Sequence, residues 1–70
     1  TSKKNLPPIA RNIRKYRNEK GISQDKLSKL TDLSFATITK IEAGDTPNPT
    51  VETMKKIADA LGVTIDDLMQ

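Results

Sequence analysis

Residues 34–44 read SFATITKIEAG, and this stretch decides the fold class. Its phenylalanine, threonine and isoleucine residues are of types enriched in strands. A half-buried strand, however, needs an apolar residue at every second position. Here Phe35, Ile38 and Ile41 recur at every third position, which is helical spacing. The stretch therefore predicts a helix over about residues 34–43.

The outer face of this predicted helix has an unusual composition. Small and β-branched residues are not the choice expected for an exposed helix face that is selected for stability alone, and the β-branched ones lose rotamer freedom in a helix. This pattern indicates that the face has another role. The residues expected to point outward are Ala36, Thr37, Thr39 and Lys40.

Periodic apolar residues and capping residues predict four further helices around one core. The helix starts are marked by Pro8, Ser23, Ser34, Thr50 and Thr64, and three helix ends are marked by Gly21, Gly44 and Gly62. The apolar residues expected to face the core outside the central helix are Ile9, Ile13, Tyr16, Leu27, Leu30, Val51, Met54, Ile57, Ala58, Leu61, Ile65, Leu68 and Met69.

Length and composition narrow the class of protein. Seventy residues form one domain, in which only about 60% of the unfolded chain's surface is buried. The chain has no cysteine, so it folds without disulfides and suits the reducing cytoplasm, and no apolar run approaches a membrane span of about 20 residues. We expect an all-α, compact five-helix domain over residues 9–70, after a flexible basic arm over residues 1–8.

The charges are divided unevenly along the chain. Residues 1–40 contain ten lysines and arginines against three acidic residues, a net charge of +7, whereas residues 41–70 contain two lysines against six acidic residues, a net charge of −4. This asymmetry favours a basic face that meets a polyanion. A solvated surface with chance clustering is the alternative.

Two short helices joined by a brief turn, within a small basic helical domain, are typical of a helix-turn-helix. The segments SQDKL (23–27), ITKIEAG (38–44) and VETMKKIADALGVTIDDL (51–68) resemble the lambda-repressor/Cro-like, or Xre, family of DNA-binding domains in order and spacing. One departure is Asp32, where the family usually has glycine; aspartate tolerates a left-handed backbone better than most residues.

The resemblance implies that the helix of residues 34–43 enters the major groove of double-stranded DNA. Small side chains there let the helix approach closely, apolar groups contact thymine methyls, and threonine and lysine hydrogen-bond to bases. The family also implies a homodimer on a pseudo-palindromic operator, with the last helix as the candidate dimer surface. The positions that match base-reading residues are Phe35, Ala36, Thr37, Thr39 and Lys40.

The resemblance also implies a set of phosphate contacts. Gln24 begins the second short helix, where a side-chain amide and free backbone N–H groups can bind a phosphate. Arg17 matches an arginine that approaches the DNA backbone, with Glu42 as the residue that orients it. Further phosphate-binding positions are Thr46, Asn48 and Thr50, with Lys3, Lys4 and Arg11 as additional basic groups.

Each of these interpretations has a simpler alternative. Phe35 either meets a base or folds back onto the core. Arg17 and Glu42 either orient a phosphate contact or form only a structural ion pair, which if exposed contributes about 0 to 1 kcal/mol. Asp66 and Asp67 resemble a catalytic pair, but neighbouring helical residues diverge by about 100°. Capping of the last helix explains them better.

The predicted function is that of a transcriptional regulator, in particular a repressor of the phage or restriction-modification controller type. The absence of histidine removes the commonest general base and metal ligand, so we expect no catalysis, no metal and no cofactor. No small-molecule ligand and no membrane partner are indicated. The alternative is a protein-interaction module, such as an antitoxin-like partner, with Phe35 as an exposed anchor.

Overall fold

The computed structural model describes residues 6–70, and all regular structure within them is helical. The helices are α1 (Pro8–Glu19), α2 (Gln24–Thr31), α3 (Phe35–Glu42), α4 (Val51–Leu61) and α5 (Ile65–Met69). The predicted all-α class with five helices is confirmed. Helix α1 begins at Pro8, the last residue of the expected arm, and the two arm lysines, Lys3 and Lys4, lie outside the described residues.

The predicted helix starts are confirmed by side-chain caps. In α2 to α5, the hydroxyl of the residue before the helix accepts the backbone N–H of the residue three positions later. Such a cap satisfies one of the four donors that a helix start leaves without a partner. At the end of α2, Asp32 adopts a left-handed conformation with φ of 61°, as expected for this position. The four capping residues are Ser23, Ser34, Thr50 and Thr64.

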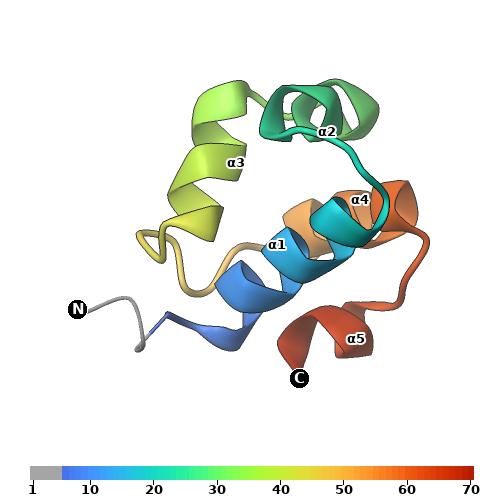
Figure 1. The fold of residues 1–70 in the computed structure, drawn as a ribbon. Helices are drawn as coiled ribbons and strands as arrows, with labels where there is room; N and C mark the ends of the chain where they lie inside the picture. The colour runs from blue at the N-terminus through green and yellow to red at the C-terminus, as the bar shows by residue number, and fades with distance from the viewer. Residues whose placement is uncertain (1–5) are drawn as a thin grey trace.

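The five helices enclose a single core. Figure 1 shows α1 crossing the middle of the molecule, with α2 above it, α3 to the left and α5 below. Helix α1 packs against α3, α4 and α5, and α2 packs against α3 and α4. The fully buried apolar side chains are Ile9, Ala10, Ile13, Leu27, Ile38, Ile41, Ile57, Ala58, Leu61 and Leu68.

Three residues that we expected in the core are exposed instead: Leu30, Val51 and Met69. In α2 the buried stripe runs through Leu27, Ser28 and Thr31, so Leu30 lies beside it. Thr31 can be buried because its hydroxyl donates to the Leu27 carbonyl at 2.9 Å. Val51 and Met69 stand at the first and last positions of their helices, beyond the reach of the core.

Candidate nucleic-acid interface

Helix α3 divides into a buried face and an open face. Ile38 and Ile41 are buried, while Phe35 keeps 50% of its surface exposed at the first position of the helix. Ala36 and Lys40 are also exposed, and Thr37 and Thr39 are partly buried. The five positions expected to read bases therefore lie on the part of α3 that does not pack into the core. The two threonines are the least exposed of the five.

Both threonine hydroxyls of α3 already have local partners. The Thr37 hydroxyl lies 2.8 Å from the Ser34 hydroxyl, and the Thr39 hydroxyl donates to the Ala36 carbonyl at 2.9 Å. A hydroxyl oxygen that donates its proton keeps two lone pairs. Thr39 can therefore still accept a hydrogen bond from a base amino group, and its methyl group adds apolar surface.

A buried carboxylate stands at the end of α3. Glu42 is only 1% exposed and accepts three hydrogen bonds. Arg17 of α1 donates to it through Nε at 2.8 Å and Nη2 at 3.1 Å, and Gln24 of α2 donates through Nε2 at 3.1 Å. Arg17 also donates through Nη1 to the Ile22 carbonyl at 2.9 Å. One carboxylate thus joins α1, α2 and α3.

This arrangement corrects the expectation of an exposed ion pair. The Arg17 side chain is 14% exposed, and the Glu42 side chain is almost completely enclosed. Breaking such a pair by removing one partner leaves an uncompensated buried charge, which costs far more than the loss of an exposed pair. Arg17 and Gln24, two of the expected phosphate-binding residues, both use side-chain donors inside the protein.

Sequence reasoning gave no role to Arg14, which joins this cluster from α1. Its Nε lies 3.6 Å from Glu42 Oε1, and its side chain is 48% exposed. The signal in the sequence was its spacing of three residues from Arg17, which places both on one face of the helix. Nothing in the sequence said that this face meets the end of α3.

The segment between α3 and α4 carries the remaining expected phosphate-binding residues. Asn48 and Thr50 are exposed, and Thr46 is partly buried. The Thr50 hydroxyl caps α4 by accepting the Thr53 backbone N–H at 3.1 Å, and it donates to the Thr53 hydroxyl at 3.0 Å. These residues lie beside the start of α4, where backbone N–H groups remain without helical partners.

Gly44, which follows α3, is confined by its own backbone and by Leu6. Its φ is +87°, and a Cβ atom built there would lie 2.9 Å from Leu6 Cδ2 and 3.2 Å from Pro7 Cδ. Residues other than glycine rarely adopt this conformation. The segment before α1 therefore packs against Gly44, two residues beyond the end of α3.

We expect Gly44→Ala to lower the free energy of unfolding by about 2 kcal/mol, because backbone strain adds to displacement of Leu6. Gly21→Ala is the matched control: φ is +70° there, but nothing lies within 4 Å of the added Cβ. We expect Gly21→Ala to lower the free energy of unfolding by about 1 kcal/mol. Urea unfolding of both variants measures the difference, and equal losses would show that the Leu6 contact contributes nothing.

Comparison with known proteins identifies the family. The sequence profile described as helix-turn-helix matches residues 13–68, which extend from within α1 into α5. The chain belongs to the helix-turn-helix family. It is a family of DNA-binding transcriptional regulators, and the matched residues include α2, the turn of residues 32–34 and α3. The resemblance noted in the sequence is thereby confirmed.

Two helix-turn-helix regulators of Bacillus subtilis (strain 168) are similar to this chain. It is 38% identical over 60 residues to the HTH-type transcriptional regulator SlrR, covering 86% of this chain and 40% of SlrR. It is 33% identical over 64 residues to the uncharacterized HTH-type transcriptional regulator RghRB, covering 91% of this chain and 46% of RghRB. The chain thus spans less than half the length of these relatives. No solved structure matches it significantly.

Across residues 6–70, no three or more histidine, cysteine, aspartate or glutamate side chains gather in a way that would hold a metal ion. None of the helices in the same range has the length and apolar character needed to cross a membrane.

Proposed function

We propose that this chain binds double-stranded DNA sequence-specifically as the DNA-binding part of a transcriptional regulator, acting in the cytoplasm of a bacterial cell. The observation that carries the proposal is the combination of the family match with the open face of α3, where Phe35, Ala36 and Lys40 are exposed. In a helix-turn-helix this second helix is the one that lies in the major groove. We propose that this regulator is a repressor of the phage or restriction-modification controller type.

Base reading is assigned to α3. Phe35 and Ala36 present apolar surface suited to thymine methyl groups, and Lys40 presents an ammonium group suited to the O6 and N7 acceptors of guanine. Thr37 and Thr39, which are partly buried, complete the set. The small size of Ala36 supports close approach of the helix backbone to the bases.

Phosphate binding is assigned to the groups that surround α3. Gln24 begins α2, and its amide has a second N–H besides the one given to Glu42. Arg17, whose guanidinium is held by Glu42, contributes positive charge close to Gln24. On the other side of α3, Thr46, Asn48 and Thr50 lead into the start of α4, where the helix dipole favours an anion.

Lys40→Ala and Gln24→Ala should separate base reading from phosphate binding. We expect Lys40→Ala to relax the preference at one base position by about tenfold in relative affinity, because a lost base contact costs about 1–3 kcal/mol. Gln24→Ala should weaken binding to all sequences nearly equally. Competition binding against a panel of single-base variants measures both effects. Unchanged preference and affinity in both variants would show that α3 is not the reading helix.

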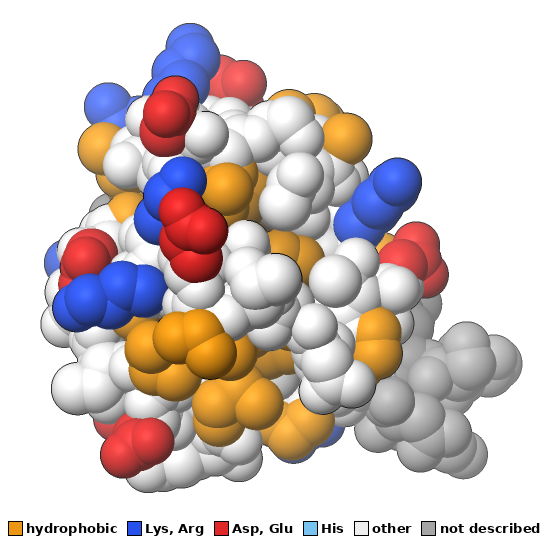
Figure 2. Space-filling view, turned by 180° about the vertical axis from the view of Figure 1, so that it is seen from behind, with side chains coloured by type: hydrophobic (Ala, Val, Ile, Leu, Met, Phe, Trp, Pro, Cys, Tyr) orange, Lys and Arg blue, Asp and Glu red, His pale blue; other side chains and the backbone are white. Residues whose placement is uncertain are grey.

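A second copy of this chain is the proposed partner on the DNA. A single module of this size buries on the order of 600–1,000 Å² of surface on DNA, which two-fold pairing doubles. The proposed dimer surface lies at α5, with Ile65 and Met69. Figure 2, which views the molecule from behind, shows hydrophobic side chains gathered in the lower half of this face, at the height at which Figure 1 draws α5.

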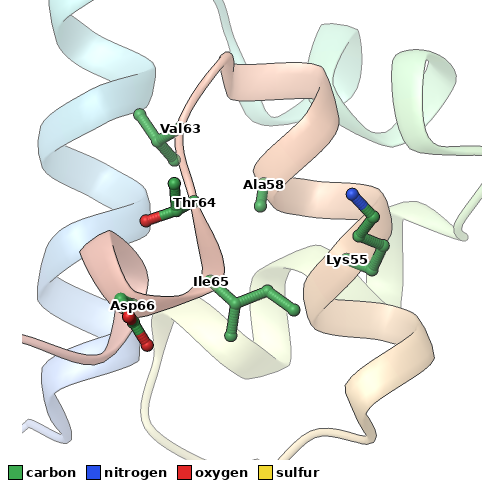
Figure 3. Close-up of a pocket in the computed structure, with 6 residues that line it drawn as sticks. All are labelled: Lys55, Ala58, Val63, Thr64, Ile65 and Asp66. Atoms are coloured by element: carbon green, nitrogen blue, oxygen red, sulfur yellow. The ribbon is translucent and has the colours of Figure 1, made fainter.

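A groove of about 410 Å³ between α4 and α5 supports this pairing. Ala58, Val63 and Ile65 give it an apolar lining, and Figure 3 shows Lys55 and Asp66 on opposite sides of Ile65. Lys55 is paired within the chain with Asp59 at 3.0 Å, so the apolar lining of the groove, and not its charges, supports the pairing.

Selection of binding sites from random duplex DNA near physiological salt tests the proposal. We expect enrichment of a motif with two-fold symmetry and half-sites about one helical turn apart. Enrichment of a single half-site would support DNA reading without the dimer. Failure to enrich any motif would contradict sequence-specific binding.

The second candidate function is a protein-interaction module. It is favoured by the two large apolar side chains that stand exposed on either side of the turn between α2 and α3, Leu30 and Phe35. Aromatic side chains such as that of Phe35 are enriched at protein–protein interfaces. In that case binding to DNA would lack a steep dependence on salt, since no counterions would be released. Failure of the selection experiment together with weak salt dependence would favour this function.

A further inference from the structure

A hydrogen bond between the two ends of the described chain lies apart from the Glu42 cluster and from the open face of α3. Asn12, in α1, donates through Nδ2 to the backbone carbonyl of Leu68, in α5, at 2.7 Å. The two residues are 56 positions apart, and the bond is partly buried. Asn12 thus ties the first helix to the last, and Figure 1 shows α5 next to α1.

Helix α5 depends on such ties because it is too short to be stable alone. It has five residues, and an isolated helix shorter than about 12–15 residues is marginal in water. At its start, the side chains of Thr64 and Asp67 each accept the backbone N–H of the other residue. The last carbonyls of a helix have no donor within it, and the Asn12 amide provides one for Leu68. The start of α5 is therefore held by its own residues and its end by α1.

The bond from Asn12 fixes the residue that leads to the exposed end of α5. Leu68 has a fully buried side chain, so its side chain and its carbonyl are both held within the fold. A peptide bond is planar, so the Leu68 carbonyl and the nitrogen and Cα of Met69 move as one unit. Met69 is 41% exposed. Asn12 therefore sets, through Leu68, the direction in which Met69 leaves the fold.

The role of Asn12 requires a donor and not only a side chain of this size. An asparagine amide donates through its nitrogen, whereas an ionised aspartate of the same shape can only accept. The Leu68 carbonyl also stands at the end of a helix, where the partial charge is negative and a second carboxylate oxygen would be repelled. Exchange of one atom group at Asn12 therefore turns an attraction into a repulsion.

We propose that Asn12 is the positioning residue for the pairing of two copies of this chain on DNA. Its bond to Leu68 holds α5 so that Met69 faces the partner copy. This inference rests on the proposed function, with α5 as the dimer surface, and it adds to that surface a residue from another helix. Asn12 acts through Leu68 and does not itself touch the partner copy.

The affinity for a duplex with two half-sites, divided by the affinity for a duplex with one, tests the inference. Pairing should give the wild type a ratio on the order of a hundredfold. Asn12→Asp should lower the ratio to about tenfold or less, because the Leu68 carbonyl loses its donor in both copies. Affinity for the single half-site should stay near that of the wild type. A merely structural role would instead weaken binding to both duplexes by the same factor and leave the ratio unchanged.

Two further variants control for charge and for folding. Asn18→Asp is the matched control, because it adds the same charge to α1 at an exposed position whose side chain forms no hydrogen bond within residues 6–70. It should keep the wild-type ratio. Asn12→Ala removes the donor without adding a charge, and it provides the measurement if Asn12→Asp fails to fold. Urea unfolding of each variant shows that it is folded under the conditions of the binding experiment.

The outcomes separate this inference from the proposed function. If the wild type prefers the two-site duplex and the Asn12 variants keep that preference, the role of Asn12 is wrong and the DNA-binding function stands. Equal weakening on both duplexes would also overturn it. If the wild type binds both duplexes equally well, pairing through α5 is wrong together with the role of Asn12, and DNA reading stands. If the wild type binds neither duplex, the DNA-binding function is overturned as well.

Discussion

Glu42→Ala is expected to lower the free energy of unfolding by about 3 kcal/mol, the largest effect on stability that we predict for a single polar side chain. The substitution leaves Arg17, which is 14% exposed, without its anion, and it removes the acceptor for Gln24. It also removes the hydrogen bonds by which Glu42 joins α3 to α1 and α2. Urea unfolding followed by circular dichroism measures the loss.

The control for Glu42 is an exposed pair on α4. Lys55 and Asp59 are 3.0 Å apart and largely exposed, so Asp59→Ala should change stability by no more than about 0.5 kcal/mol. If Glu42→Ala fails to fold, Glu42→Gln provides the measurement, because it keeps one acceptor oxygen while it removes the charge and replaces the other oxygen by an NH2 group. A loss from Glu42→Ala as small as that from Asp59→Ala would contradict the structural role of the buried carboxylate.

Ala36→Glu is expected to weaken DNA binding at least about a hundredfold while the protein stays folded. The longer side chain would prevent close approach of α3, and its carboxylate would be repelled by the phosphates, which costs several kcal/mol. Stability should be unchanged or slightly raised. The first turn of α3 contains no acidic residue, and a negative charge there interacts favourably with the helix dipole.

Fluorescence anisotropy on the selected duplex, with urea unfolding alongside, measures both effects of Ala36→Glu. Gln70→Glu is the control for net charge, because it adds the same charge beyond the end of α5. It should change affinity only slightly. Affinity of Ala36→Glu within tenfold of the wild type would place the DNA elsewhere than on the outer face of α3.

Much of the fold was predictable because its signals are local. The helix starts at Ser23, Ser34, Thr50 and Thr64 depend on a hydroxyl and a backbone N–H three residues away, and all four caps are present. The left-handed backbone at Asp32 depends on that residue's own conformational preference. Interactions of this range are encoded within a few consecutive residues.

The errors have a shared origin. Leu30, Val51 and Met69 fit the apolar pattern of their helices, yet each is exposed. A periodic pattern shows which face of a helix is apolar, but neighbouring helices determine how wide a stripe of that face is covered and how far it extends toward the helix ends. The helices that pack against α2, α4 and α5 therefore leave these three side chains uncovered.

The helices and their caps follow from the sequence alone, since each rests on contacts between residues close in the chain, and the composition of the outer face of α3 is read directly from it. Which of the charged side chains around Glu42 are buried depends instead on how the helices pack. Arg17 is separated from it by 25 positions and Gln24 by 18, and their side chains meet only because α1, α2 and α3 pack together. Burial is a property of that packing, and it distinguishes Arg17, which is enclosed, from Arg14, which faces solvent three residues earlier.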